Sequence, residues 1–150
     1  MDYRYMPILG VRPAEMRALE ELAANVKDTM LPYIALQPWL AAKELASAVA
    51  RINAAVGLRP IIADISEALP IQGKRRPVHD AFDLLRSSTN GYKHYIDFVS
   101  QNENFLPALQ LTDLTELDHQ IARLIDLDRD ITIRLHEPML QFAGNIAEKF

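Results

Sequence analysis

Cysteine is absent from the 150 residues of this chain. The absence excludes disulfide bonds, thiolate nucleophiles and cysteine-ligated zinc sites. Long apolar runs are absent as well, since none approaches the roughly 18 residues that a membrane-spanning helix requires. The first residues include an acidic one, Asp2, and no apolar core of the kind found in signal peptides. We therefore expect a cytoplasmic protein that makes no membrane contact.

An excess of positive charge is also missing. The 16 lysines and arginines are outnumbered by 20 aspartates and glutamates, which gives a net charge of −4 at pH 7. Such a chain as a whole repels nucleic acid and anionic membranes, so nucleic acid is not the expected partner. One short cluster has the opposite sign, because Lys74, Arg75 and Arg76 follow one another directly.

The chain has the apolar content of a globular domain, with a hydrophobic fraction of 49%, and it is long enough to bury a real core. Strand-like and helix-like segments alternate along it. Strands are predicted over residues 5–9, 31–37, 59–66, 106–112 and 130–136. Helices are predicted over residues 13–30, 40–56, 78–88, 113–128 and 138–150, with a turn at 89–91 and an ambiguous segment at 92–102.

This alternation predicts one α/β domain over residues 1–150, with parallel strands joined by helical crossovers. Pro7, Pro32, Pro60 and Pro107 each lie at or near the start of a predicted strand, which suggests one unit used repeatedly. A partial TIM-barrel-like fold is therefore expected, and an open flavodoxin-like sheet is the alternative. The predicted strands are fewer than those of a complete barrel. The domain is thus expected to be the N-terminal part of a larger barrel, an open sheet, or half of a homodimer.

Several short motifs lie in the segments at 5–19, 31–36 and 59–66 and near residue 134. The positions that form them are Tyr5, Pro7, Ile8, Leu9, Arg12, Glu15, Ala18, Leu19, Pro32, Ile34, Asp64 and Arg134. In these motifs the chain resembles the beta family proteins of bacteria and phages. The resemblance implies a TIM-barrel-like fold about twice as long as this chain, an association with phages and mobile elements, and no particular activity.

Two positions depart from the pattern of that family. Gly10 stands where its members usually carry lysine, and Ala35 stands where they usually carry glutamate. If the lysine and glutamate form an ion pair or act together in catalysis, this chain lacks both partners. The resemblance therefore does not imply that an activity of the family is retained.

The carboxyl ends of the predicted strands carry the candidate chemistry, because active sites lie there in barrels and in open parallel sheets. Asp64, Arg134 and His136 are the candidate catalytic residues. Together they would bind an anionic substrate and transfer a proton. In the structural alternative, Asp64 caps a turn or pairs with Arg134, and His136 is a solvated loop residue. The spacing of the four histidines matches no metal-binding motif, and no metal or cofactor is predicted.

The same rule selects further polar residues near the strand ends: Gln37, Ser66 and Gln110. Trp39, the only tryptophan, follows the second predicted strand. It either lines a pocket at this end of the sheet or packs as a hydrophobic staple on the next helix.

The candidate ligand-binding residues are Arg12 and Glu15 after the first strand, and Lys74, Arg75 and Arg76 before the helix at 78–88. A helix N-terminus attracts anions, so the three adjacent cations there would hold a phosphate. The segment is not a P-loop, because the leading glycine and the Ser or Thr after the lysine are absent. A solvated basic loop and a simple Arg12–Glu15 ion pair are the structural alternatives.

Three functions are compatible with these observations. The first is a phage- or mobile-element-associated beta-type protein that acts by binding a protein partner. The second is a hydrolase-like enzyme that acts on a phosphorylated or acidic substrate at the strand ends. The third is a nucleic-acid-associated factor that uses Lys74, Arg75 and Arg76.

Overall fold

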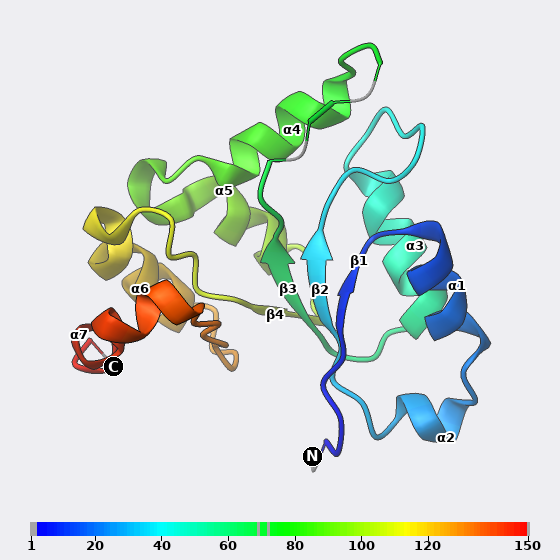
Figure 1. Ribbon diagram of the computed structural model, residues 1–150, viewed down its shortest axis with the longest axis horizontal. Coiled ribbons are helices and arrows are strands. Elements are labelled where there is room, and N and C mark those ends of the chain that lie inside the picture. The colour runs from blue at the N-terminus through cyan, green and yellow to red at the C-terminus, as the bar shows by residue number, and fades with distance from the viewer. Residues whose placement is uncertain (1–2, 69, 72, 150) are drawn as a thin grey trace.

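The computed structural model describes residues 3–68, 70–71 and 73–149, in which strands and helices alternate (Figure 1). The strands are β1 (Ile8–Gly10), β2 (Tyr33–Leu36), β3 (Ile61–Ile65) and β4 (Phe105–Pro107). The helices are α1 (Pro13–Glu21), α2 (Ala24–Lys27), α3 (Ala46–Val56), α4 (Pro77–Arg86), α5 (Thr89–Ser100), α6 (Leu117–Ile125) and α7 (Ala143–Ala147). The 3-10 helices η1 (Leu114–Glu116) and η2 (Glu137–Phe142) precede α6 and α7.

The strands form one sheet in the order β1-β2-β3-β4, and every neighbouring pair is parallel. This arrangement confirms the predicted α/β class. Over the described residues the sheet is open, as the alternative expects, and each strand pairs with the next one along the chain. The register places Gly10 beside Ala35, and Ala35 beside Asp64. These three residues therefore form one row across β1, β2 and β3.

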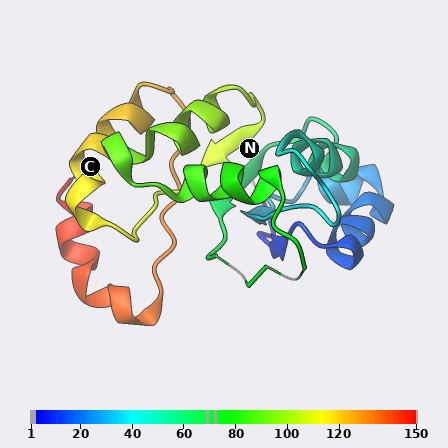
Figure 2. The ribbon, with the colours of Figure 1, turned by 90° about the horizontal axis from the view of Figure 1, so that it is seen from above.

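The two faces of the sheet have different coverings. Alternate strand residues, among them Ile34, Ile61 and Phe105, belong to the main core together with buried residues of α1, α3, α4, α5 and α6. Tyr33 and Ile62 point to the other face, where they pack in a small cluster of strand and loop residues. Right-handed crossovers between consecutive strands place their helices on one face. Figure 2 shows this arrangement from above, with α1 and α3 toward β1 and α5 and α6 toward β4.

The first strand lies later in the chain than predicted. Tyr5 makes an isolated parallel bridge with Met30, and regular pairing with β2 begins at Ile8 and includes Gly10. The reason is Pro7, which has no N–H to donate to a ladder. Its carbonyl oxygen still accepts from the Tyr33 N–H at 2.8 Å. Gly10 is therefore part of the strand rather than of the turn.

The helix predicted over 13–30 is two helices, because Leu22 and Ala23 adopt extended conformations between α1 and α2. The Lys27 ammonium donates to the carbonyl oxygens of Glu20 and Ala55, both at 2.8 Å. It thus caps the carboxyl ends of α1 and α3. The apolar periodicity of the sequence could not reveal this break, because the capping bond joins residues from distant segments.

The boundaries of α3 are partly as predicted. The helix begins at Ala46 rather than at residue 40, and Ala41 has a positive φ of 58°. Its end is confirmed, because Gly57 has φ 73° and donates its N–H to the Asn53 carbonyl at 2.8 Å. Most of the segment from 89 to 102, predicted as a turn and an ambiguous stretch, forms α5 (Thr89–Ser100), whose Asn90, Gly91 and Tyr92 have left-handed backbone angles.

The strand predicted over 130–136 is wrong in extent. It is reduced to one isolated parallel bridge between Ala108 and Thr132. The Leu109 N–H donates to the Thr132 carbonyl at 2.8 Å, and the Thr132 N–H donates to the Pro107 carbonyl at 2.9 Å. After it, the helix predicted over 138–150 is divided into η2 and α7. No helix in the described part of the chain is long and apolar enough to cross a bilayer.

Candidate functional site

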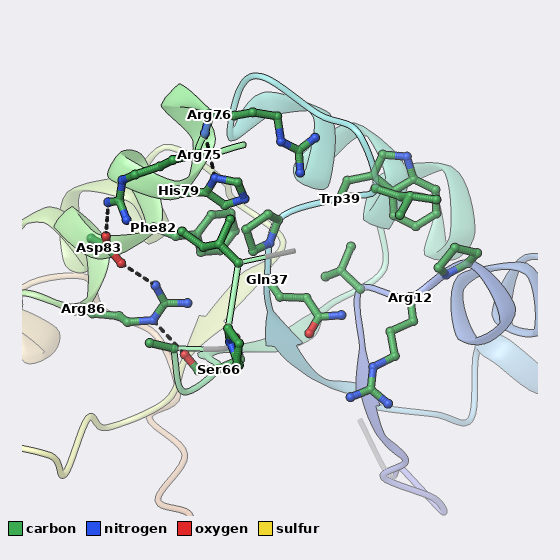
Figure 3. A pocket seen from close by; sticks show the side chains of 17 residues that line it. Arg12, Gln37, Trp39, Ser66, Arg75, Arg76, His79, Phe82, Asp83 and Arg86 are labelled. Carbon is green, nitrogen blue, oxygen red and sulfur yellow. Dashed lines mark hydrogen bonds and ion pairs between the residues drawn. The ribbon is translucent and has the colours of Figure 1, made fainter. Parts of the chain in front are cut away.

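A cavity of about 760 Å³ lies at the carboxyl ends of β1, β2 and β3 (Figure 3). Its walls are the segments that follow these strands, together with one side of α4. In parallel α/β folds, ligands bind at this end of the sheet. Four arginines line the cavity: Arg12, Arg75, Arg76 and Arg86.

Three of these arginines already have acidic partners. Arg75 makes ion pairs with Asp80, at 2.7 Å, and with Asp83. Arg86 contacts Asp83 at 3.0 Å. Its Nε also donates to the Ser66 carbonyl at 3.0 Å, which ties α4 to the end of β3. The hydrogen bond from Arg75 is the main reason that the pKa of the Asp83 carboxyl lies below its usual value.

Arg12 is paired more weakly. Its guanidinium lies 3.5 Å from Glu15 Oε1 and is largely exposed. The other oxygen of Glu15 accepts a hydrogen bond from the Gly10 N–H. Glu15 thus fixes the start of α1 to the end of β1. Glu15 therefore has a structural role, and its ligand-binding role stays a prediction.

Arg76 and His79 form the start of α4. Arg76 precedes the helix, and its backbone N–H donates to His79 Nδ1 at 2.8 Å. Because Nδ1 accepts this bond, the proton of the neutral ring is on Nε2. His79 is 9% exposed and lines the cavity. The ring therefore offers a hydrogen-bond donor from an almost buried position.

The opposite side of the cavity has an aromatic residue. Trp39 lies across from Arg76 and His79 in Figure 3, and its chain neighbours Pro38 and Leu40 also line the cavity. Arg51 contacts the Trp39 ring with its guanidinium carbon 5.6 Å from the ring centre. Trp39 thus lines the pocket, which is the first of the two roles weighed from the sequence.

A second polar cluster lies on the sheet face that the helices leave free. Asp64 is its centre, with Oδ2 accepting from the Tyr33 hydroxyl and Oδ1 from Gln110 Nε2, both at 2.7 Å. Oδ1 also accepts from the Ile65 N–H at 2.8 Å. Burial, and then the nearby Asp64 charge, raise the pKa of the Tyr33 hydroxyl well above its usual value. Tyr33 therefore stays protonated and donates to the carboxylate.

Arg134 joins this cluster through Tyr33, since its guanidinium carbon lies 5.3 Å from the centre of the Tyr33 ring. The structure thus brings two of the three candidate catalytic residues, Asp64 and Arg134, around one tyrosine. His136 is exposed and lies at the start of η2. Lys74 is also exposed, and neither it nor Glu15 lines the cavity. The catalytic and binding roles stay predictions.

Several residues of these sites were not identified from the sequence, among them Tyr33, His79 and Arg86. Tyr33 lies within a strand, so the rule that functional residues follow the strand ends does not select it. His79 and Arg86 lie on α4, and only their helical spacing from Arg76 and Asp83 could have signalled a shared face. Among the residues that the structure describes, no group of three or more histidine, aspartate or glutamate side chains is arranged to hold a metal ion.

Comparisons with known proteins extend these observations. A family model described as Beta protein matches residues 5–149. Protein beta of Enterobacteria phage P4 is 30% identical to the chain over 137 residues. The matched region is 89% of this chain and 37% of the phage protein, so the chain spans little more than a third of that relative. No solved structure gave a significant match.

Proposed function

The chain belongs to the Beta protein family, and we propose that it binds an anionic, phosphate-bearing ligand at the carboxyl ends of its strands. One observation supports this most directly: four arginines line the cavity there, whereas among the described residues Asp83 is its single acidic lining residue. Arginine suits phosphate because its planar group donates several hydrogen bonds at once. A hollow of about 760 Å³ suits a small molecule, which favours such a ligand over a protein partner.

Binding is favoured over hydrolysis by the state of the candidate acid. Both oxygens of Asp64 already accept hydrogen bonds, from Tyr33, Gln110 and the Ile65 backbone. A general acid or base needs a free position within reach of the substrate. His136, the other proton-transfer candidate, is exposed. Hydrolysis is therefore a weaker hypothesis than ligand binding.

Calorimetric titration with inorganic pyrophosphate tests the proposal. Arg76→Ala removes the cavity arginine that has no acidic partner in the described residues, and Arg17→Ala removes an exposed arginine of α1 that pairs with Glu21. A hydrogen bond between charged groups contributes about 1.5–3 kcal/mol, so Arg76→Ala should weaken binding roughly ten- to a hundredfold. Arg17→Ala should leave it unchanged. Absence of binding to the unaltered protein at low salt would refute the proposal.

For the fold, we propose that this sheet is part of a TIM-barrel-like unit. Strands in chain order, helices on one face and the Ala108–Thr132 bridge beyond β4 support it. In a closed barrel both edges of β1 are paired. Hydrogen exchange of the β1 amides in the longest natural form of the protein tests this. Slow exchange at Ile8, Leu9 and Gly10 is expected, and fast exchange at all three would contradict it.

A further inference from the structure

The cavity has two chemically different ends, and the end at α4 carries three of its four arginines. Arg75, Arg86 and Arg12 already contact carboxylates. The Arg76 guanidinium has no such contact among the described residues, and it lies at the N-terminus of a ten-residue helix. A helix N-terminus carries a partial positive charge of about half an elementary charge. Arg76 and the helix therefore act on an anion from the same direction.

His79 adds a hydrogen-bond donor at this end. His79 is only 9% exposed, and its Nδ1 is occupied by the Arg76 N–H. Its Nε2–H is the group left to donate, and no hydrogen bond engages it within the described residues. This donor belongs to an almost buried side chain that lines the cavity, so it points to a ligand that the cavity holds.

The other end contains the single tryptophan. Pro38, Trp39 and Leu40 are consecutive lining residues, and they give this end an apolar surface. Arg51 contacts the Trp39 ring but does not line the cavity, so part of the ring remains available to a ligand. Aromatic rings of a ligand stack on tryptophan irrespective of their substituents. Inorganic phosphate alone would leave this apolar surface and most of the volume unused.

We infer that the ligand is a phosphate monoester of a molecule with a flat ring, of the nucleoside monophosphate class. Its phosphate lies against Arg76 and His79 Nε2, and its ring lies on Trp39. The inference rests on the proposed function and adds to it the class of ligand and its direction in the cavity.

Trp39 is the only tryptophan of the chain, so its fluorescence reports binding directly. The unaltered protein is titrated with adenosine 5′-monophosphate, ribose 5-phosphate, adenosine and inorganic phosphate. Stacking on an aromatic side chain contributes about 1–3 kcal/mol per base. The nucleotide should therefore bind roughly five- to a hundredfold more tightly than ribose 5-phosphate, and it should quench the fluorescence.

Variants separate the two ends in a calorimetric titration with the same nucleotide. His79→Asn keeps an oxygen near the position of Nδ1, where it still accepts from the Arg76 N–H, but it removes the Nε2 donor. It should weaken nucleotide binding about tenfold and leave adenosine unaffected. Trp39→Leu should reduce the affinity for the nucleotide to that for ribose 5-phosphate. His94→Gln, on α5 and outside the cavity lining, is the matched control.

The outcomes distinguish this inference from the proposed function. If no phosphate compound binds, the proposed function fails and the inference fails with it. If ribose 5-phosphate binds as tightly as the nucleotide, the ligand class is wrong while the proposed function stands. If His79→Asn changes nothing, the placement of the phosphate at α4 is overturned.

Discussion

Replacement of Asp64 distinguishes a structural carboxylate from a catalytic one. Its oxygens accept from the Tyr33 hydroxyl and Gln110 Nε2 at 2.7 Å, and from the Ile65 N–H at 2.8 Å. Tyr33 and Gln110 are 3% and 7% exposed, so water cannot readily replace the carboxylate. A buried donor without an acceptor costs about 1–3 kcal/mol. Asp64→Ala should therefore lower the free energy of unfolding by about 2–5 kcal/mol.

Asp64→Asn is the matched control, because it has the same shape. Its amide oxygen still accepts from Gln110 and Ile65, and its NH₂ group donates to the Tyr33 hydroxyl, which can accept. The loss should be about 1 kcal/mol or less. Urea denaturation followed by far-ultraviolet circular dichroism gives both values, with an unchanged m-value as the check on two-state unfolding.

A double-mutant cycle with Tyr33→Phe tests the cause. The phenylalanine removes one of the three donors, so Asp64→Ala should be less destabilising in that background, with an interaction energy of about 0.5–3 kcal/mol. Equal destabilisation by alanine and asparagine would show that the charge matters rather than the hydrogen bonds. An alanine variant as stable as the unaltered protein would refute the structural account of Asp64.

Three further predictions concern stability. Gly91→Ala should destabilise the protein by about 2–4 kcal/mol in urea denaturation, because Gly91 has φ 63° and a Cβ would lie 2.6 Å from the Gln120 backbone nitrogen. Gly144→Ala is the control, since a Cβ there meets nothing within 4 Å, and it should change the free energy of unfolding little. Arg129→Met should lower the melting temperature by several degrees, since its Nη1 donates at 3.0 Å to the carbonyls of Val99, Asn102 and Phe105. Burial raises the pKa values of Tyr33 and Tyr95, so both keep their protons in the folded state while the unfolded chain releases them. Stability measured between pH 9 and 11 should therefore be full below about pH 10 and fall above it, whereas a flat profile would contradict the burial of these hydroxyls.

The class of the fold was accessible from the sequence because local patterns determine it. Alternating apolar runs and helical periodicities indicated the parallel α/β order, and Gly57 marked the end of α3 through its positive φ. The break between α1 and α2 and the loss of the last predicted strand depend on contacts between distant segments instead. Lys27 caps α1 and α3 at once, and residues near Thr132 reach the sheet through a single bridge. Local periodicity cannot predict either contact.

The candidate site was accessible in part for a related reason. Residues directly after strands are placed by the topology alone, and Arg12, Gln37 and Ser66 do line one cavity. Arg75 and Arg76 line it as well, because α4 borders the cavity and Arg86 at its carboxyl end is tied to the Ser66 carbonyl after β3. His79 escaped prediction, since its role depends on a ring nitrogen bound to a backbone N–H. The row of Gly10, Ala35 and Asp64 needed the strand register, which no single segment specifies.

The most direct test of the central claim is the place where an anion binds. We would record the ¹H–¹⁵N spectrum of the protein while adding inorganic pyrophosphate. The account predicts that the amide signals of Ser66, Arg76 and His79 and the indole signal of Trp39 shift together and saturate with one Kd. Shifts confined to cations outside the cavity, such as Lys93 or Arg17, with these four signals unmoved, would contradict it.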